Sequence, residues 1–294
     1  MKTLLFSLAS VLAVIYPTHA QISAGGTIVV FQLAKNEFVI AADSRAVVNS
    51  GESAEDNACK ISAFKSNGTV FAVGGFDYYE RGKDDLMPSW SAMKEAKRAV
   101  VLSGPTGTMD AADAARKIAQ IWGHNTLKRW EQMRVHQPRV VSALAFAGKG
   151  ILNTGLFVSS RKGSVAFAWT AVILNDGKLS ITHPTFPCTS LPCAFGKMEV
   201  FNRYGSSDKD FMTPPASSMK SWSFELLRVI KLVELTIAED TSGGVGGPID
   251  ALELLNDGTI RWRQRKGSCP ENSDKAATSP SRSSPRRRAA VSAN

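Results

Sequence analysis

The chain has 294 residues, of which 21% are charged, and a formal net charge of +9. A chain of this length buries enough surface for one domain of roughly 240 residues to fold without a metal or a disulfide. Five basic and two acidic residues follow Gly267, so the tail alone carries +3 of the net charge. The rest is only mildly basic and has no platform of aromatic and basic residues, so we expect no nucleic-acid partner.

The first twenty residues have the pattern of a signal peptide. Lys2 gives a positive start, residues 4–15 are largely apolar, and Thr18 and Ala20 supply small residues for cleavage. The apolar run is too short to span a membrane, and no later segment is long enough. We therefore expect a secreted or periplasmic protein with no membrane span. The alternative is that residues 1–20 form a buried strand or helix.

Apolar periodicity and turn residues predict the elements that follow. In chain order these are a hairpin of strands at 27–33 and 38–42, strands at 60–64 and 70–73, an irregular stretch at 78–107, a helix from 110 to about 130, strands at 139–146, 165–174 and 179–182, a helix at 224–239, and a closing hairpin of strands at 249–255 and 259–262. Strands and helices that occur in separate groups favour an α+β layered domain over an alternating parallel-sheet fold.

The ends of the chain lie outside this domain. Residues 267–294 are rich in Ser, Pro and Arg and contain no aromatic residue, which predicts a disordered basic tail. The predicted domain therefore covers residues 27–266, preceded by the signal peptide and by a propeptide at 21–26.

The four cysteines are Cys59, Cys188, Cys193 and Cys269. Cys188 and Cys193 enclose only four residues, and we expect them to form a disulfide in an exported protein. No C-x-x-C pair or histidine cluster predicts zinc, and the glycines at 243–247 lack the Gly-Lys-Ser/Thr ending of a phosphate-binding loop. We expect neither a metal nor a cofactor.

A series of short motifs begins at the first hairpin. Its second strand ends in Ala42-Asp43-Ser44-Arg45; Lys60 lies 17 residues after Asp43, and Gly74 of a Gly-Gly pair lies 14 residues after Lys60. With these motifs, and further matches at 140–148 and 246–250, the chain resembles the proteasome β subunits, N-terminal-nucleophile (Ntn) hydrolases of the peptidase T1 type. The resemblance covers most of residues 26–262. It implies a four-layer αββα sandwich, in which two antiparallel sheets lie between helix layers.

The resemblance also implies a catalytic set. Thr27 would be the nucleophile of a threonine endopeptidase, and its own α-amine, with an ordinary pKa of about 7.7–8.0, would be the base. Lys60 would stabilise the alkoxide, Asp43 would hold Lys60, and the Gly74 N–H would face the oxyanion. A peptide or protein would be the substrate, and a homo-oligomer or ring would be the assembly.

Each of these residues also has a structural interpretation. Thr27 could be an ordinary strand residue, Asp43 an ion-pair partner of Arg45, Lys60 a solvated lysine, and Gly74 a backbone bend.

Two departures from the family pattern leave alternatives open. Ile28 replaces the usual second threonine, and another register would place Gly26 at the nucleophile position and leave the protein inactive. The distal aspartate of the family corresponds either to Glu239 or to Asp240, and we favour Asp240.

The leading hypothesis is therefore an exported threonine endopeptidase or amidohydrolase. The alternatives are a non-catalytic member of the proteasome fold, similar to the α subunits, and a secreted binding module. A serine hydrolase is not indicated, because no G-x-S-x-G motif is present.

Overall fold

The structure is a computed structural model. It describes residues 21–24, 27–48, 53–56, 58–80, 87–104, 108–146, 150–204 and 222–269. The predicted signal peptide lies outside these residues, as do residues 25–26 of the predicted propeptide and residues 270–294 of the predicted tail.

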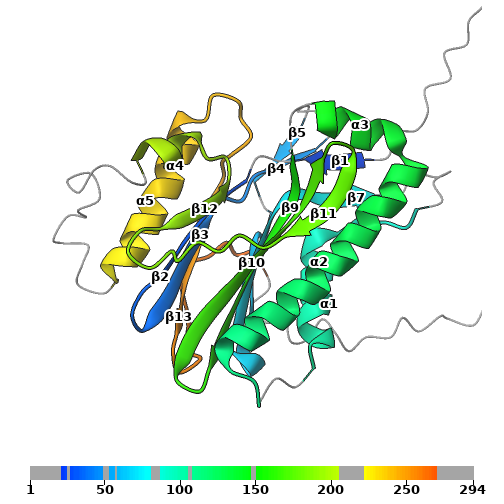
Figure 1. Cartoon of the computed structure of the whole chain (residues 1–294). Coiled ribbons are helices and arrows are strands. Elements are labelled where there is room, and N and C mark those ends of the chain that lie inside the picture. The colour runs from blue at the N-terminus through cyan, green and yellow to red at the C-terminus, as the bar shows by residue number, and fades with distance from the viewer. Residues whose placement is uncertain are drawn as a thin grey trace, which may run out of the picture.

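The described residues form two antiparallel sheets (Figure 1). The first has the order β11 (Lys178–Thr182), β10 (Ser164–Asn175), β9 (Ile151–Arg161), β7 (Thr69–Glu80), β1 (Gln21–Ala24), β4 (Ala46–Val48) and β5 (Ser53–Glu55), with β6 (Ile61–Phe64) and β8 (Trp90–Ser91) also paired to β7. The second has the order β12 (Cys193–Gly196), β2 (Ile28–Leu33), β3 (Glu37–Ala42), β13 (Asp250–Leu255) and β14 (Ile260–Gln264). A short 3-10 helix at Lys65–Asn67 joins β6 to β7.

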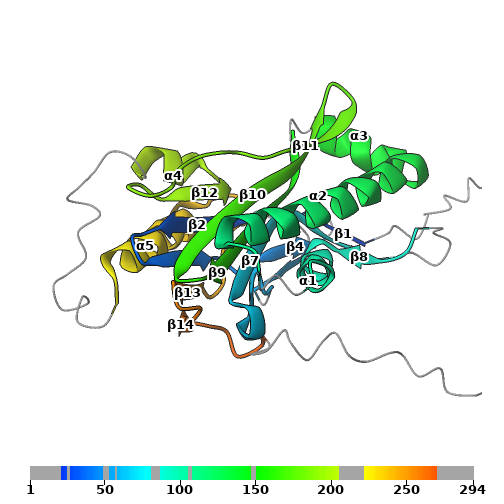
Figure 2. The ribbon, with the colours of Figure 1, turned by 60° about the horizontal axis from the view of Figure 1, so that its bottom comes forward.

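Helices cover the outer faces of both sheets. On the first sheet lie α1 (Ala92–Leu102) and α2 (Ala111–His136), with α3 (Pro138–Phe146) packed on α2; on the second lies α5 (Phe224–Glu239), with α4 (Glu199–Tyr204) beside it. Figure 2 shows the two helix groups on opposite sides of the strands. The expected four-layer αββα sandwich is therefore confirmed. No helix in the described part of the chain combines the length and the apolar character that a membrane span requires.

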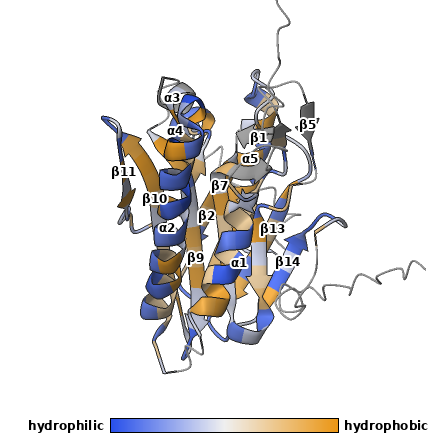
Figure 3. Ribbon diagram, turned by 90° about the vertical axis from the view of Figure 1, so that its right-hand side faces the viewer, coloured by the Kyte–Doolittle hydropathy of each residue, from blue (hydrophilic) through white to orange (hydrophobic). Residues whose placement is uncertain are grey.

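Three apolar layers hold the sandwich together. Along β2, Val29 and Phe31 point between the sheets, whereas Ile28 and Val30 point toward α5. Because successive side chains of a strand face opposite sides, a strand buried on both faces has a continuous apolar sequence. In Figure 3 the strands β7, β9 and β10 are accordingly largely orange, and α2 carries blue residues as well.

Two predicted elements were wrong. The segment predicted as a strand at 139–146 is helix α3, which begins at Pro138 directly after α2 and matches the preference of proline for the first helical turn. The strand that lies between β7 and β10 is β9, which the sequence did not reveal. The stretch expected to be irregular contains α1, whose Ala96 and Val100 are buried against the sheet.

Two disulfides close the described domain. The predicted pair Cys188–Cys193 is confirmed, and a second bridge joins Cys59 to Cys269 across 210 residues of sequence. Cys269 is buried, and Lys266 before it forms a buried ion pair with Asp250 at 3.2 Å. Cys269, which lies three residues past the predicted boundary at 266, is therefore covalently joined to the described domain.

The two bridges are expected to differ in their effect on stability. In the chain-entropy model, a loop of 210 residues contributes about 5 kcal/mol to the free energy of unfolding, and a loop of 5 residues about 2 kcal/mol. We expect Cys59→Ser/Cys269→Ser to lower the free energy of urea unfolding by more than Cys188→Ser/Cys193→Ser does. A chain that ends after Gly267 should lose as much as the first double variant, whereas one that ends after Cys269 should not. Equal losses for the two bridges would contradict this expectation.

Candidate active site

Asp43 and Lys60 form a buried ion pair. Asp43 follows the last residue of β3, Lys60 precedes the first residue of β6, and Lys60 Nζ lies 2.7 Å from Asp43 Oδ1. The Asp43 side chain is fully buried, and only 5% of the Lys60 side chain is exposed. Since unpaired charges are strongly disfavoured at such depth, each residue requires the other. The interpretation of Lys60 as a solvated strand lysine is therefore wrong.

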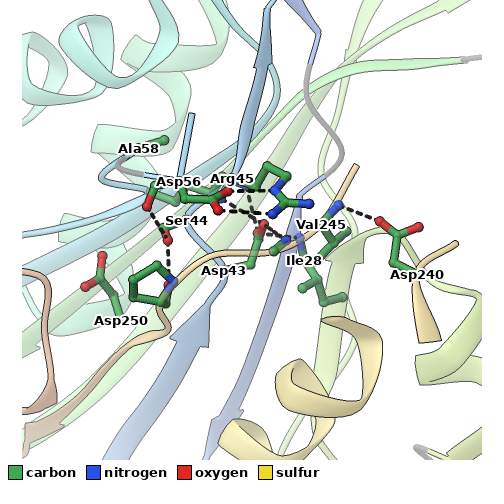
Figure 4. A network of polar contacts seen from close by, with 12 residues as sticks. Ile28, Asp43, Ser44, Arg45, Asp56, Ala58, Asp240, Val245 and Asp250 are labelled. Carbon is green, nitrogen blue, oxygen red and sulfur yellow. Dashed lines mark hydrogen bonds and ion pairs between the residues drawn. The ribbon is translucent and has the colours of Figure 1, made fainter. Parts of the chain in front are cut away.

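Three backbone amides fix the carboxylate of Asp43. The N–H groups of Ile28, Arg45 and Gly246 donate to it at 3.0, 3.2 and 3.1 Å. Ile28 is the residue directly after Thr27, so the ion pair with Lys60 is anchored one peptide away from the predicted nucleophile. Figure 4 shows Asp43 pointing at Ile28.

The guanidinium of Arg45 has a different partner. It binds Asp56, with Nε 2.6 Å from Oδ1, and this hydrogen bond holds the pKa of the Asp56 carboxyl below its usual range. Asp43 contacts only the backbone N–H of Arg45 at 3.2 Å. The structural interpretation of Asp43 as the ion-pair partner of Arg45 is therefore wrong.

Gly74 brings the backbone of β7 against Thr27. A Cβ at position 74 would lie 3.3 Å from Cγ2 of Thr27 and 2.8 Å from the ring of Phe195. The next residue, Gly75, has φ of 92°, and a Cβ there would lie 2.3 Å from the carbonyl oxygen of Leu152. Gly74 therefore permits the close approach of β7 to Thr27, and Gly75 permits that of β7 to β9.

Thr27 lies at a break in strand pairing along β7. On one edge of β7, the pairing with β6 ends at Ala72, and the pairing with β1 begins at Phe76. Gly74 lies in this interval, and Thr27, whose exposed fraction is 5%, packs against it. Thr27, Asp43, Lys60 and Gly74 are thus brought together from four separate segments.

Asp240 is the buried centre of a second polar cluster, whose member Ser242 is exposed. Its carboxylate accepts hydrogen bonds from Lys197 Nζ, from the hydroxyl and N–H of Ser242, and from the N–H of Val245 at 2.6 Å. Burial alone would raise the pKa of Asp240, but the bonds from Lys197, Ser242 and Val245 outweigh it and hold that pKa well below its usual range. Glu239, the alternative, pairs with Arg203 and is more exposed. Of the two alternatives, Asp240 is therefore the buried carboxylate.

The two clusters are joined through consecutive amides. Val245 N–H donates to Asp240, and the next residue, Gly246, donates to Asp43. The predicted residues thus belong to one network, with Asp240 joined to the Thr27 group through this loop.

Lys197 is the member of this network that sequence reasoning missed. Its backbone N–H donates to the Thr27 carbonyl at 2.7 Å, and its ammonium binds Asp240 and Ser242. It lies in none of the recognised motifs, and β12, the strand that ends just before it, was not predicted. The only sequence signal is Gly196 before it, with φ of 104°.

The network combines two buried carboxylates, Asp43 and Asp240, with two lysines, Lys60 and Lys197. Among the described residues, no three His, Cys, Asp or Glu side chains are grouped to hold a metal ion. The described geometry thus places a buried lysine, held by an aspartate, one peptide away from a threonine.

The sequence and the fold of the chain were compared with those of known proteins. No protein-family model matches it, and no curated protein does. Among the solved structures that match is the "Anbu (Gly-1) mutant" from Hyphomicrobium sp. strain MC1, with 16% sequence identity, a TM-score of 0.45, and coverage of 83% of this chain and 88% of that chain. At this identity no residue role is carried over, so the functional inference depends on the geometry of the site.

Proposed function

We propose that the chain is a threonine endopeptidase that works in the manner of proteasome β subunits. Thr27 is the nucleophile once the Gly26–Thr27 bond has been cut. The observation that carries the proposal is the buried Lys60–Asp43 ion pair, hydrogen-bonded to the amide that follows Thr27. Burying two charges costs desolvation free energy that their attraction often does not recover. Such pairs are common at functional sites, so this one favours a role for Lys60 and Asp43 in the chemistry.

The chemistry proceeds in two steps. The Thr27 hydroxyl attacks the substrate carbonyl while the α-amine accepts its proton, and the same proton passes to the leaving amine as the ester forms. Water, deprotonated by the α-amine, then hydrolyses the ester and restores the hydroxyl. Lys60 stabilises the alkoxide throughout, and Asp43 compensates the charge of Lys60. The Gly74 N–H stabilises the oxyanion.

The position of β1 supports an extended peptide as the substrate. Residues 21–24, which precede Thr27, pair antiparallel with β7 on one side and with β4 on the other. A segment that ends near the nucleophile and lies between two strands has the geometry of the acyl side of a cleavable peptide. A substrate that replaces β1 could form the same backbone hydrogen bonds, a common mode of peptide recognition.

Export and assembly remain part of the proposal. The disulfides Cys59–Cys269 and Cys188–Cys193 support an oxidising compartment, in agreement with the signal peptide expected at residues 1–20. The family resemblance implies a homo-oligomer or ring, which light scattering of the purified protein would test.

The test of the function is hydrolysis of a panel of fluorogenic peptides by the purified chain. We expect turnover, together with an adduct on Thr27 after treatment with a peptide aldehyde and borohydride, which traps an imine on a free α-amine. A chain without turnover or adduct would favour the alternatives, a non-catalytic member of the fold or a binding module.

The matched control is Arg45→Lys. Arg45 lies close to the site, but its guanidinium binds Asp56 rather than Asp43. This variant should keep the adduct on Thr27.

A further inference from the structure

Lys197 lies against the peptide of the proposed nucleophile. Its N–H donates to the Thr27 carbonyl at 2.7 Å, which continues the β12–β2 ladder by one residue. On the opposite side of β2, Asp43 N–H donates to the Ile28 carbonyl and Asp43 Oδ1 accepts from Ile28 N–H. The dipeptide Thr27-Ile28 is thus held between Lys197 and Asp43.

The approach of Lys197 depends on the glycine before it. A Cβ on Gly196 would lie 1.6 Å from the Thr27 carbonyl oxygen, and φ at Gly196 is 104°. Only glycine adopts this conformation readily and leaves room for that contact. The backbone at 196–197 is therefore shaped to meet Thr27.

The side chain of Lys197 points to the other buried carboxylate. Its ammonium binds Asp240 and lies 2.8 Å from the Ser242 hydroxyl. The Asp240 side chain is fully buried, whereas 23% of the Lys197 side chain is exposed. Lys197 is therefore the cation that compensates the buried Asp240, as Lys60 compensates Asp43.

The link from Lys197 to the first ion pair runs through the loop 240–246. Asp240 accepts from Val245 N–H at 2.6 Å, and Gly246 N–H donates to Asp43 at 3.1 Å. Figure 4 shows Asp240 pointing at Val245 and, in the same view, Asp43 pointing at Ile28. Asp240 and Asp43 are thus bound by the N–H groups of two consecutive residues.

We propose that Lys197 is a positioning residue of the Thr27 site. Its backbone fixes the Thr27 carbonyl, and its ammonium, through Asp240 and the loop 240–246, holds Asp43 and hence Lys60 in place. The inference rests on the proposed function, since positioning has a catalytic consequence only if Thr27 is the nucleophile.

Two readouts of Lys197→Met test this role. Hydrogen exchange of the amides of Ser242, Val245 and Gly246 should become faster, because Asp240 has lost its cation. In peptide hydrolysis, kcat should fall by about 10–100-fold with KM changed by less than about twofold, since small misplacements of catalytic groups cost up to about 10²-fold. The variant Lys197→Arg should keep the exchange rates and kcat close to those of the wild type, because it retains a cationic donor.

The matched control is Lys231→Met, which removes a lysine from an exposed pair with Glu234 on α5. Should Lys197→Met fail to fold, Asp240→Asn removes the same ion pair from its other side, and the same exchange and kcat changes are expected. Exchange and kcat that stay equal to those of Lys231→Met would overturn the inference.

A failure of the proposed function has a different signature. The wild-type chain would then show no hydrolysis, while Lys197→Met still accelerates exchange in the loop. That result would retain the coupling of Lys197 to Asp43 and remove the threonine endopeptidase. If the wild-type chain shows no hydrolysis and Lys197→Met shows no faster exchange, both the proposed function and the role of Lys197 are overturned.

Discussion

Thr27→Ala is expected to reduce the rate of peptide hydrolysis by at least about 10⁴-fold. When catalytic residues act together, removing one of them costs nearly as much rate as removing all of them. Thr27 lies beside Gly74 and one peptide away from the Asp43–Lys60 pair, so the proposed mechanism depends on its hydroxyl. Thr27→Ser should retain measurable turnover, since serine supplies the same hydroxyl. The measurement is kcat/KM on the best peptide of the panel.

The stability of Thr27→Ala separates the two interpretations of Thr27. The substitution removes a hydroxyl and a small methyl contact, so the free energy of unfolding should fall by about 1 kcal/mol. Turnover like that of the wild type would show that Thr27 is an ordinary strand residue.

Lys60→Met is expected to abolish hydrolysis and also to destabilise the fold. With the lysine gone, the carboxylate of Asp43 stays buried without a cation, which typically costs about 3–5 kcal/mol. The free energy of urea unfolding and the hydrolysis rate should therefore both fall.

The double variant Lys60→Met/Asp43→Asn tests whether the pair serves the chemistry. It removes both charges, so most of the lost stability should return, while hydrolysis should remain absent. A stable double variant that still hydrolyses peptides would show that the pair is structural only.

Local sequence patterns predicted the elements that lie around the site. The helix at 224–239 has the predicted bounds, because its apolar face repeats at helical spacing and Ser223 caps its first turn. The opening hairpin was also predicted to within one residue, since β2 and β3 are buried on both faces. The motif spacing also singled out Asp43, Lys60 and Gly74, which the structure brings close to Thr27-Ile28.

Contacts between distant segments account for what the sequence did not predict. The strand that pairs with β7 is β9, whereas residues 139–146 form a helix. Which segment pairs with β7 depends on packing against α2, which a local sequence pattern does not reveal. Cys59 and Cys269 meet only because the segment after β14 folds back over the residues before β6. Lys197 reaches Thr27 through a strand with only four residues, too short to give a periodic pattern.

The mass of the mature chain tests the central claim most directly. Intact-mass analysis of the purified wild-type protein should show a chain that begins at Thr27. The Thr27→Ala variant should retain residues 21–26, because the Thr27 hydroxyl is needed to cut the Gly26–Thr27 bond. A wild-type chain that hydrolyses peptides while it still begins at Gln21 would contradict the account, since the α-amine of Thr27 would then be blocked.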